Sequence, residues 1–394
     1  LTAPVRSRSV AAGSTAEYEW TVTNCKNEIQ GVVLSHKKEG WETMTVRLQP
    51  ERFVLGPGES RSVRLHVDVP DRTAPGGYER QTILSLGNGS ADAAEEIAFQ
   101  TARSLPHPYI LMTEPEWSDT RRRIQGNASL QELLDRYVQR AERWEVPAVH
   151  PERYMFETHH SHEAQNAAIV WKLTGETRYA EKAVLFLRRL TAPSNGYASR
   201  MKACSQELVH EGEFFKHTAA VYDLLYESDL LDLMDHARIE EAFRLYMDLI
   251  DWNLRTGQIS NWTLAELTGA TFCALALQDL ERMNRFVFGS CGAMEHLAKG
   301  TLDDGWWYEC SVGYNLLAAG LLTELAQSLR PWGINLAEIW VPASYYERVS
   351  AGERPDIDGL VQDIWGPNKR NYRSIAQLWD SLLPFADYRG IVFG

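Results

Sequence analysis

Hydrophobic and polar residues alternate along the first hundred residues of this chain. The runs EYEWTV (17–22) and SVRLHV (62–67) have a period of two, which is the pattern of strands that bury one face. Turn-forming glycine, proline and asparagine gather between such runs, at 56–58, 74–77 and 87–89. Short strands at this spacing predict a β-sandwich over residues 1–103.

The hydrophobic period changes after the segment LPHP (105–108), which we predict to be a linker. Beyond it, apolar residues recur with the 3.6-residue period of amphipathic helices. Helices are predicted at 116–124, 129–144, 160–173, 177–190, 205–225, 237–254, 262–277, 281–299, 312–328 and 372–382. Successive helical hairpins without intervening strands favour an (α/α) barrel or toroid over residues 104–394.

The end of the chain, GIVFG (390–394), has the composition of a strand. We therefore expect the natural protein to continue into a C-terminal antiparallel β-sheet domain, which would leave the toroid incomplete here. The alternative is an ordinary short C-terminal strand.

Charge and hydropathy narrow the class of partner. The chain has 53 acidic and 40 basic residues and a net charge of −13, which argues against nucleic acid as a partner. A local cluster of Arg, Lys and His can still bind an acidic ligand inside a cleft. No apolar run of about eighteen residues exists, so we expect no membrane span. The chain starts at Leu1 without a signal segment, and we interpret it as a mature chain, secreted or periplasmic.

Cysteine and tryptophan usage adds two expectations. The five cysteines are scattered and odd in number, which argues against a disulfide framework or a zinc knuckle, and we expect no cofactor or metal in this chain. The thirteen tryptophans are many for this length, and indole faces can stack on sugars. Trp262 and Trp307 lie within the motifs below and are candidates for that role, although core filling explains any single Trp equally well.

The segment LDDGWWYECSVGYNLLAAGLL (302–322) is the first candidate for chemistry. Asp304 and Gly305 predict a turn, and Gly313 and Tyr314 open an apolar helix. A tyrosine at the start of a rigid helix can be held over a cleft as an acid or base. The alternative is that Tyr314 is a half-buried aromatic covering the helix pack.

The segment QISNWTLAELTGA (258–270) is the second candidate. Ser260 is a plausible N-cap, which places Asn261 at the start of a helix. Backbone N–H groups at that position favour an anion, and the Asn261 amide can donate to a carboxylate. The alternative is that Asn261 only caps the helix.

Two further segments carry polar clusters. In 156–183, His160 shares the packed helix face with Ala164 and Ala167, and His159 and His162 lie on a neighbouring face. We expect these histidines to bind sugar or transfer protons rather than to bind metal, because His-x-His alone is a weak metal motif. The alternative for each one is a buried histidine whose hydrogen bonds are satisfied within the fold.

In 199–227, Arg200 supplies positive charge, and Glu211 and Glu213 could bind sugar hydroxyls. A solvated helix face is the plain alternative.

Taken together, KLTGETRYAEKA, AAVYDLLYE, SNWTLAELTGA and DDGWWYECSVGYNLLAAGLL resemble the heparinase II/III-like polysaccharide lyases, a superfamily that includes alginate and heparin lyases. The resemblance covers residues 106–394, and the first hundred residues resemble immunoglobulin-like accessory domains of glycan-processing enzymes. The resemblance to the lyases implies an (α/α) toroid followed by an antiparallel β-sheet domain, with an acidic polysaccharide or oligosaccharide bound between these two domains.

The resemblance also implies a chemistry, β-elimination at a uronate. Asn261 matches the asparagine that contacts the carboxylate, and Tyr314 matches the tyrosine that acts as general acid, and in some members as base. Glu309 lies beside the motif and would position either group. Many members have Asn-His where this chain has Asn261-Trp262, and His160 or His162 would have to replace that histidine.

Other catalytic groups, and a divalent metal in some members, belong to the family's β-sheet domain, so a further domain or a second chain would complete the site. Two other functions stay open. One is an (α/α)-barrel glycoside hydrolase with paired carboxylates, for which Asp303, Asp304, Glu211, Glu213 and Glu309 are candidates. The other is a non-catalytic glycan-binding protein.

Overall fold

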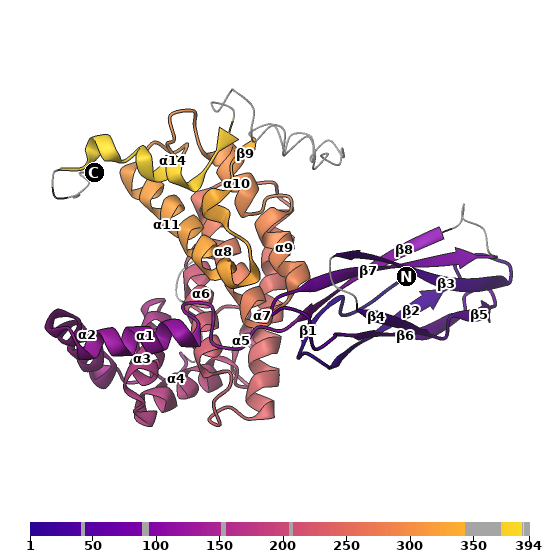
Figure 1. The fold of residues 1–394 in the computed structure, drawn as a ribbon, viewed down its shortest axis with the longest axis horizontal. Coiled ribbons are helices and arrows are strands. Elements are labelled where there is room, and N and C mark those ends of the chain that lie inside the picture. The colour runs from indigo at the N-terminus through magenta and orange to yellow at the C-terminus, as the bar shows by residue number, and fades with distance from the viewer. Residues whose placement is uncertain are drawn as a thin grey trace. The chain divides into compact units, whose positions relative to one another are not determined.

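The computed structural model describes residues 1–40, 44–88, 94–150, 155–204, 208–342, 372–387 and 389. The chain divides into two compact units, Leu1–Pro106 with Gln278–Glu281, and His107–Leu277 with Arg282–Gly394. Figure 1 gives the order of the elements in both. Among the residues that the structure describes, no helix has the length and apolar character needed to cross a bilayer.

The first unit is a β-sandwich of two sheets. One sheet has the strand order β1-β8-β7-β3-β5 and the other has the order β2-β6-β4. All neighbouring strands are antiparallel except β1 and β8, which pair in parallel. The strands are β1 (Ser7–Val10), β2 (Thr15–Thr23), β3 (Gln30–Gly40), β4 (Thr45–Gln49), β5 (Arg52–Leu55), β6 (Ser60–Asp68), β7 (Tyr78–Gly87) and β8 (Ala94–Arg103).

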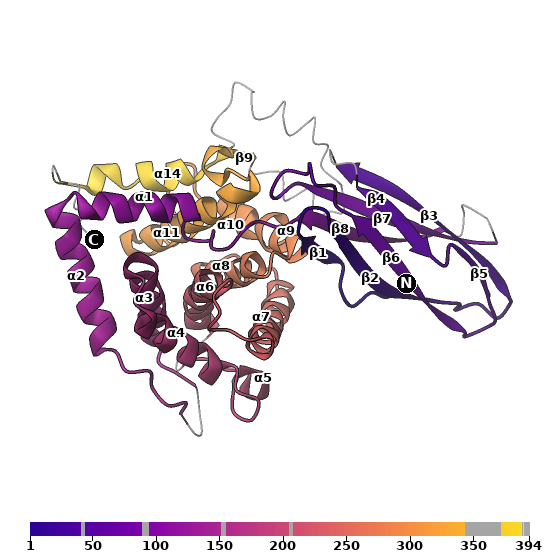
Figure 2. The same cartoon turned by 60° about the horizontal axis from the view of Figure 1, so that its bottom comes forward.

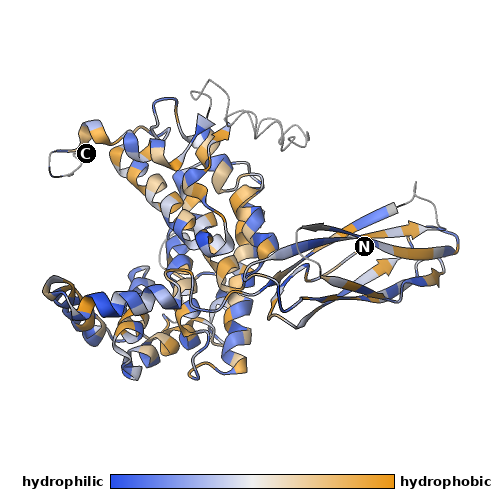
Figure 3. Cartoon of the chain, in the orientation of Figure 1, coloured by the Kyte–Doolittle hydropathy of each residue, from blue (hydrophilic) through white to orange (hydrophobic). Residues whose placement is uncertain are grey.

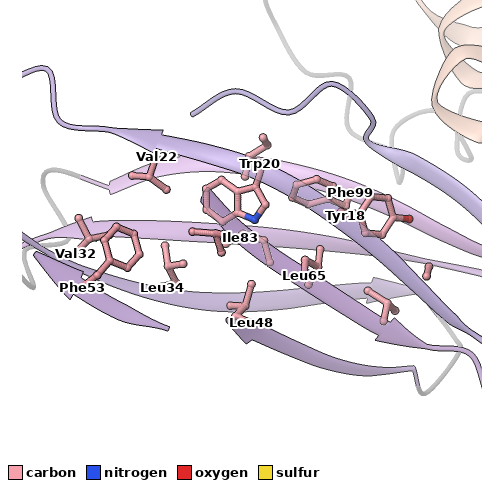
Figure 4. Close-up of a cluster of buried hydrophobic side chains, with 14 of the residues drawn as sticks. Tyr18, Trp20, Val22, Val32, Leu34, Leu48, Phe53, Leu65, Ile83 and Phe99 are labelled. Carbon is pink, nitrogen blue, oxygen red and sulfur yellow. The ribbon is translucent and has the colours of Figure 1, made fainter. Parts of the chain in front are cut away.

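The alternation along each strand builds the core between the sheets. In β2 every second residue is buried, and Tyr18 and Trp20 point inward. They join Leu65 of the same sheet and Ile83 and Phe99 of the other sheet in one hydrophobic cluster (Figure 4). The sequence therefore predicted the sandwich correctly, because the period of two is a local signal.

The second unit is helical, and its helices form the inner and outer layers of an (α/α) toroid. Its main helices are α1 (Glu114–Gln125), α2 (Ala128–Arg143), α3 (His159–Thr174), α4 (Thr177–Leu190), α6 (Leu208–Leu225), α7 (Leu233–Leu254), α8 (Asn261–Ala276), α9 (Leu280–Phe288), α10 (Ala293–Gly300), α11 (Val312–Leu329) and α14 (Ile375–Asp380). Helix α3 packs on α6, α6 on α8, and α8 on α11, a row that can be followed in Figure 2.

Helix α8 is the centre of this row. All of its residues except Trp262 are buried, and its hydrophobic residues are orange in Figure 3. A helix surrounded by protein is typically apolar on most of its surface, and in α8 the one carboxyl group is that of Glu266. Two glycines let α6 approach it closely, because a Cβ on Gly212 would lie 2.3 Å from the Ala265 carbonyl oxygen and one on Gly269 would lie 2.3 Å from the Gly212 oxygen.

Two of the predicted helices differ in extent from those in the structure, and one helix was missed. The helix expected at 281–299 is two helices, since the chain breaks between Phe288 and Ala293, where Gly292 caps α10 and Cys291 has a φ of +54°. The helix expected at 372–382 begins only at Ile375, because Tyr372–Arg373 forms strand β10 and pairs with β9 (Val341–Pro342). The short helix α5 (Tyr197–Arg200) was not expected.

The segment predicted as a linker contains the boundary between the two units, and residues on both sides of that boundary are buried. Leu105 and His107 are buried. Within the first unit the Leu105 amide donates to Gln278 Oε1 at 2.9 Å, and within the second unit His107 Nδ1 lies 2.7 Å from Asp223 Oδ1. The expected strand at 390–394 lies outside the described residues.

All five cysteines are free thiols. Cys25 in the sandwich and Cys310 in the helical unit are exposed, and the other three are buried.

Candidate functional site

The candidate residues sit at the beginnings of four helices that pack in series. His159, His160 and His162 open α3, Glu211 and Glu213 lie in the first turns of α6, Asn261 and Trp262 open α8, and Tyr314 is the third residue of α11. Glu213 contacts His162, and Gly212 packs against Ala265, so the N-terminal halves of α3, α6 and α8 lie side by side. These residues are far apart in the sequence, and the fold brings the beginnings of α3, α6 and α8 together. Helix α11, which carries Tyr314, packs on α8.

Asn261 is fixed by the cap of α8. The Ser260 side chain accepts a hydrogen bond from the Thr263 amide at 3.2 Å, and Thr263 Oγ1 lies 2.8 Å from Nε2 of the buried His296. Asn261 itself is only 4% exposed, whereas the neighbouring Trp262 is 47% exposed. At the N-terminus of α8, where the helix dipole is positive, Asn261 is thus buried and only the neighbouring Trp262 is exposed.

Tyr314 is held on a rigid helix and is 46% exposed. The next residue, Asn315, is buried and accepts a hydrogen bond from the Trp307 amide at 2.7 Å, while its own amide donates to the Leu378 oxygen at 2.8 Å. These hydrogen bonds hold the first turn of α11 against the segments that contain Trp307 and Leu378. The Tyr314 phenol is therefore attached to a firmly held helix turn.

His160 has its ring hydrogen-bonded on one side. The Trp144 indole donates to His160 Nδ1 at 3.4 Å, which leaves the ring proton on Nε2. Burial lowers the pKa of His160, because the charged imidazolium is less well solvated there. A neutral imidazole with its N–H on Nε2 acts as a hydrogen-bond donor to a substrate more readily than as a base.

A basic pocket opens beside these histidines. Its volume is about 480 Å³, and it is lined by Arg136, Gln139, Arg140, Arg143, Trp144, His159 and Glu163. Arg140 is neutralised by Glu163, with Nε 2.9 Å from both carboxylate oxygens. Arg136 and Arg143 remain to give the pocket positive charge on a protein whose net charge is −13. We call this the arginine pocket.

His162, Glu213 and a third residue, His217, form a compact cluster between α3 and α6. His162 Nε2 lies 3.0 Å from Glu213 Oε1, and His217 Nε2 lies 3.8 Å from the same oxygen. The hydrogen bond from His162 holds the pKa of Glu213 well below its usual range. Burial lowers the pKa of His217 to about 4. At neutral pH the carboxylate is therefore charged and the His217 ring is neutral.

Three of the predicted sugar-contacting residues have other roles in the structure. Trp307 is fully buried and packs against Gly300, and its indole donates to Glu309 Oε2 at 2.7 Å, so it has no free face for a sugar. Glu211 is buried and accepts a hydrogen bond from the Ala203 amide at 2.5 Å, which ties a loop to α6. Arg200, in α5, donates to the His150 carbonyl oxygen.

The sequence analysis missed His217 and the arginine pocket. The signal for His217 was the spacing Glu213-x-x-x-His217, which places both side chains on one face of a helix. Arg136, Arg140 and Arg143 also recur at three- and four-residue spacing, but only the structure shows that this face meets His159.

Comparisons with known proteins bear on the fold. No protein-family model matches the chain, and no curated protein matches it in sequence. Among solved structures it is similar to an alginate lyase from Bacteroides ovatus, at 13% identity over 72% of this chain and 84% of that one, with a TM-score of 0.51.

A second similar structure is alginate lyase A1-III from Sphingomonas species A1, at 14% identity over 60% of this chain and 84% of that one, with a TM-score of 0.36. Alginate lyase A1-III complexed with a tetrasaccharide gives 13% identity, 67% and 93% coverage and a TM-score of 0.42. The similarity to the Bacteroides ovatus protein shows that the helical unit shares the (α/α) toroid fold, and at this identity it shows the fold alone.

Proposed function

We propose that this protein is a polysaccharide lyase that cleaves a uronate-containing glycan by β-elimination. The observation that carries the proposal is the (α/α) toroid itself, in which Asn261 and the exposed Tyr314 lie in the first turns of two helices, α8 and α11, that pack on one another. The same fold occurs in alginate lyases. The arginine pocket supports an acidic substrate, because its guanidinium groups match carboxylates in charge and shape.

In this mechanism each residue has one task. A base removes the C5 proton of the uronate, electrons move to form the C4–C5 double bond, and the C4–O bond breaks with the leaving oxygen taking a proton. Asn261 would donate to the carboxylate, whose charge grows as the proton leaves, and the helix dipole adds to that stabilisation. Tyr314 would protonate the leaving oxygen and, in its ionised form, could also remove the C5 proton.

Substrate contacts would extend along the row of helix beginnings. The exposed face of Trp262 would stack on a sugar ring beside Asn261. His160, with its proton on Nε2, and His159 would donate to hydroxyl or carboxylate oxygens. Residues outside the described part, in a further domain or a second chain, would complete the site. A polymeric glycan does not cross a membrane, so the enzyme would act outside the cytoplasm, secreted or periplasmic.

The decisive experiment follows the product. Elimination creates an unsaturated uronate that absorbs in the ultraviolet, so the protein is incubated with a panel of polyuronates and the absorbance is recorded. We expect the absorbance to grow with the natural protein and to be abolished by Tyr314→Phe, with unchanged circular dichroism. Tyr137→Phe is the matched control, because Tyr137 is exposed to a similar extent, 41%, on a different helix.

The other outcomes separate the remaining functions. Reducing ends without absorbance would replace the lyase with a glycoside hydrolase. Saccharide binding without any product would indicate a glycan-binding protein. Full activity in Tyr314→Phe would remove Tyr314 from the mechanism.

A further inference from the structure

The cluster of His162, Glu213 and His217 is unlike the other polar contacts of the helical unit. It joins two inner helices, α3 and α6, and it brings three ligand atoms of metal-binding side chains within 4.8 Å of one another. The two imidazole rings are tilted by 48° relative to one another, with centroids 3.8 Å apart. Two rings in such close contact direct their nitrogen atoms towards the same carboxylate.

A fourth residue fixes the orientation of His217. Its Nδ1 contacts Gln165 Oε1, an amide oxygen that can only accept a hydrogen bond. With Gln165 Oε1 as the acceptor, the ring carries its proton on Nδ1 and the lone pair of Nε2 faces Glu213. This Nε2 is buried and has no hydrogen-bond partner among the described residues. A buried nitrogen lone pair costs free energy unless something binds to it.

The separations fit a small ion placed between the ligands. Two ligands of a tetrahedral Zn²⁺ at bond lengths near 2.0–2.1 Å are about 3.3–3.4 Å apart. The distances from Glu213 Oε1 to His162 Nε2 and to His217 Nε2, 3.0 and 3.8 Å, lie on either side of that value. Small rotations of the glutamate side chain would make them equal.

The local charge and access also suit a cation. The ammonium group of Lys216, the residue before His217, is paired with Glu324 at 2.7 Å, so it does not oppose a metal ion at full strength. The side chains of His162 and Glu213 are both partly exposed, which gives the site a path to solvent.

We propose that His162, Glu213 and His217 bind a divalent transition-metal ion, with Zn²⁺ as the best match to two imidazoles and one carboxylate. Gln165 positions His217 from outside the ligand set, the arrangement by which metal-binding histidines are usually oriented. Three protein ligands leave a fourth position for a water molecule or an oxygen atom of a ligand. The sequence analysis expected no metal in this chain, and the proposal replaces that expectation independently of the proposed lyase activity.

The test uses Co²⁺ and Zn²⁺ as probes on the full chain. The protein is treated with a chelator and titrated with Co²⁺, whose visible bands report its coordination, and Zn²⁺ binding is measured by calorimetry. We expect one ion per chain and the visible bands of a four- or five-coordinate site containing nitrogen ligands.

Variants locate the site. His162→Ala and His217→Ala should abolish the visible bands, and Gln165→Leu should weaken binding by roughly 10–100-fold while retaining all three ligands. His159→Ala is the matched control, since His159 lies on the same helix one turn from His162 and outside the cluster. It should bind the ion as the natural protein does.

Two results would overturn the proposal. One is the absence of stoichiometric binding by the natural protein. The other is metal binding that stays unchanged in both His162→Ala and Gln165→Leu. These two variants are used because neither side chain is fully buried, so their loss should not unfold the protein. Circular dichroism of each variant confirms that it is folded, and His217→Gln replaces His217→Ala if the alanine variant is not.

Discussion

At the scale of single residues, the most unusual group in the helical unit is Glu266, in the middle of the buried helix α8. It is 3% exposed, and burial raises the pKa of its carboxyl from the ordinary 4.5 to about 7. The Asn253 amide donates to its Oε2 at 2.5 Å and partly compensates for the burial. The folded state therefore favours the protonated, neutral form of the Glu266 carboxyl.

This raised pKa makes stability depend on pH. The native state holds the proton more tightly than the unfolded chain, so stability contributed by neutral Glu266 is lost as the pH rises from about 4.5 through about 7. Glu266→Gln keeps an acceptor for Asn253 but cannot ionise. We expect it to match the natural protein at pH 4.5 and to exceed its unfolding free energy by up to about 3 kcal/mol at pH 8.

Urea unfolding followed by circular dichroism at the two pH values measures this difference. Glu132→Gln, on the exposed surface of α2, is the control and should leave the pH dependence unaltered. An equal pH dependence in the natural protein and in Glu266→Gln would contradict the burial argument.

How far residues could be assigned from the sequence depends on how local their signals are. The position of Asn261 at a helix start was predictable, because Ser260 is a residue that commonly caps helices. Its side chain accepts a hydrogen bond from the amide of Thr263, three residues later. The burial of Trp307 and Glu211 was not, because each is set by contacts with Gly300 and Ala203, whose proximity comes from the tertiary fold. The same holds for the contact of His217 with Gln165.

At the scale of elements, the approach of α6 to α8 determines where Glu213 and Asn261 lie. Gly212 sits so near the Ala265 backbone that a methyl group has no space there. Gly320 in α11 differs, because a Cβ added to it would meet nothing within 4 Å.

The two glycines therefore predict opposite effects of the same substitution. Gly212→Ala should destabilise the protein by about 1–3 kcal/mol, because the helices must move apart. Gly320→Ala should stabilise it by about 0.5–1 kcal/mol, because alanine favours a helix interior. Urea unfolding of both variants checks this, and equal effects would show that the inter-helix contact is softer than these distances imply.

Most helix positions followed from the 3.6-residue period, whereas their ends and interruptions followed from backbone details. The extension of α7 to Leu233 reflects the capping box of Asp232 and Asp235. The break between α9 and α10 reflects glycines whose effect the apolar pattern of residues 281–299 concealed.

At the scale of the whole molecule, an acidic protein is proposed to bind an acidic polymer. The general field of a chain with net charge −13 repels such a ligand, and only local positive charge can reverse this. Arg136 and Arg143 in the arginine pocket are placed to do so.

Two double variants distinguish the effect of local charge on substrate binding from the effect of the overall charge. Arg136→Gln/Arg143→Gln and the control Arg178→Gln/Arg244→Gln both change the net charge from −13 by −2, to −15. Only the first should raise KM for a polyuronate severalfold at low salt with kcat nearly unchanged. The difference should shrink as salt shortens the Debye length below about 8 Å. Equal KM values in the two variants would exclude the pocket from substrate binding.

The distribution of thiols has a practical consequence. Each compact unit carries one exposed cysteine, Cys25 in the first and Cys310 in the second, and the remaining three are buried. Thiol-reactive dyes or spin labels should therefore attach at one position in each unit of the native protein without any engineered residue. Energy transfer or dipolar coupling between the two labels then reports directly on the separation of the sandwich and the toroid in solution, with and without a glycan.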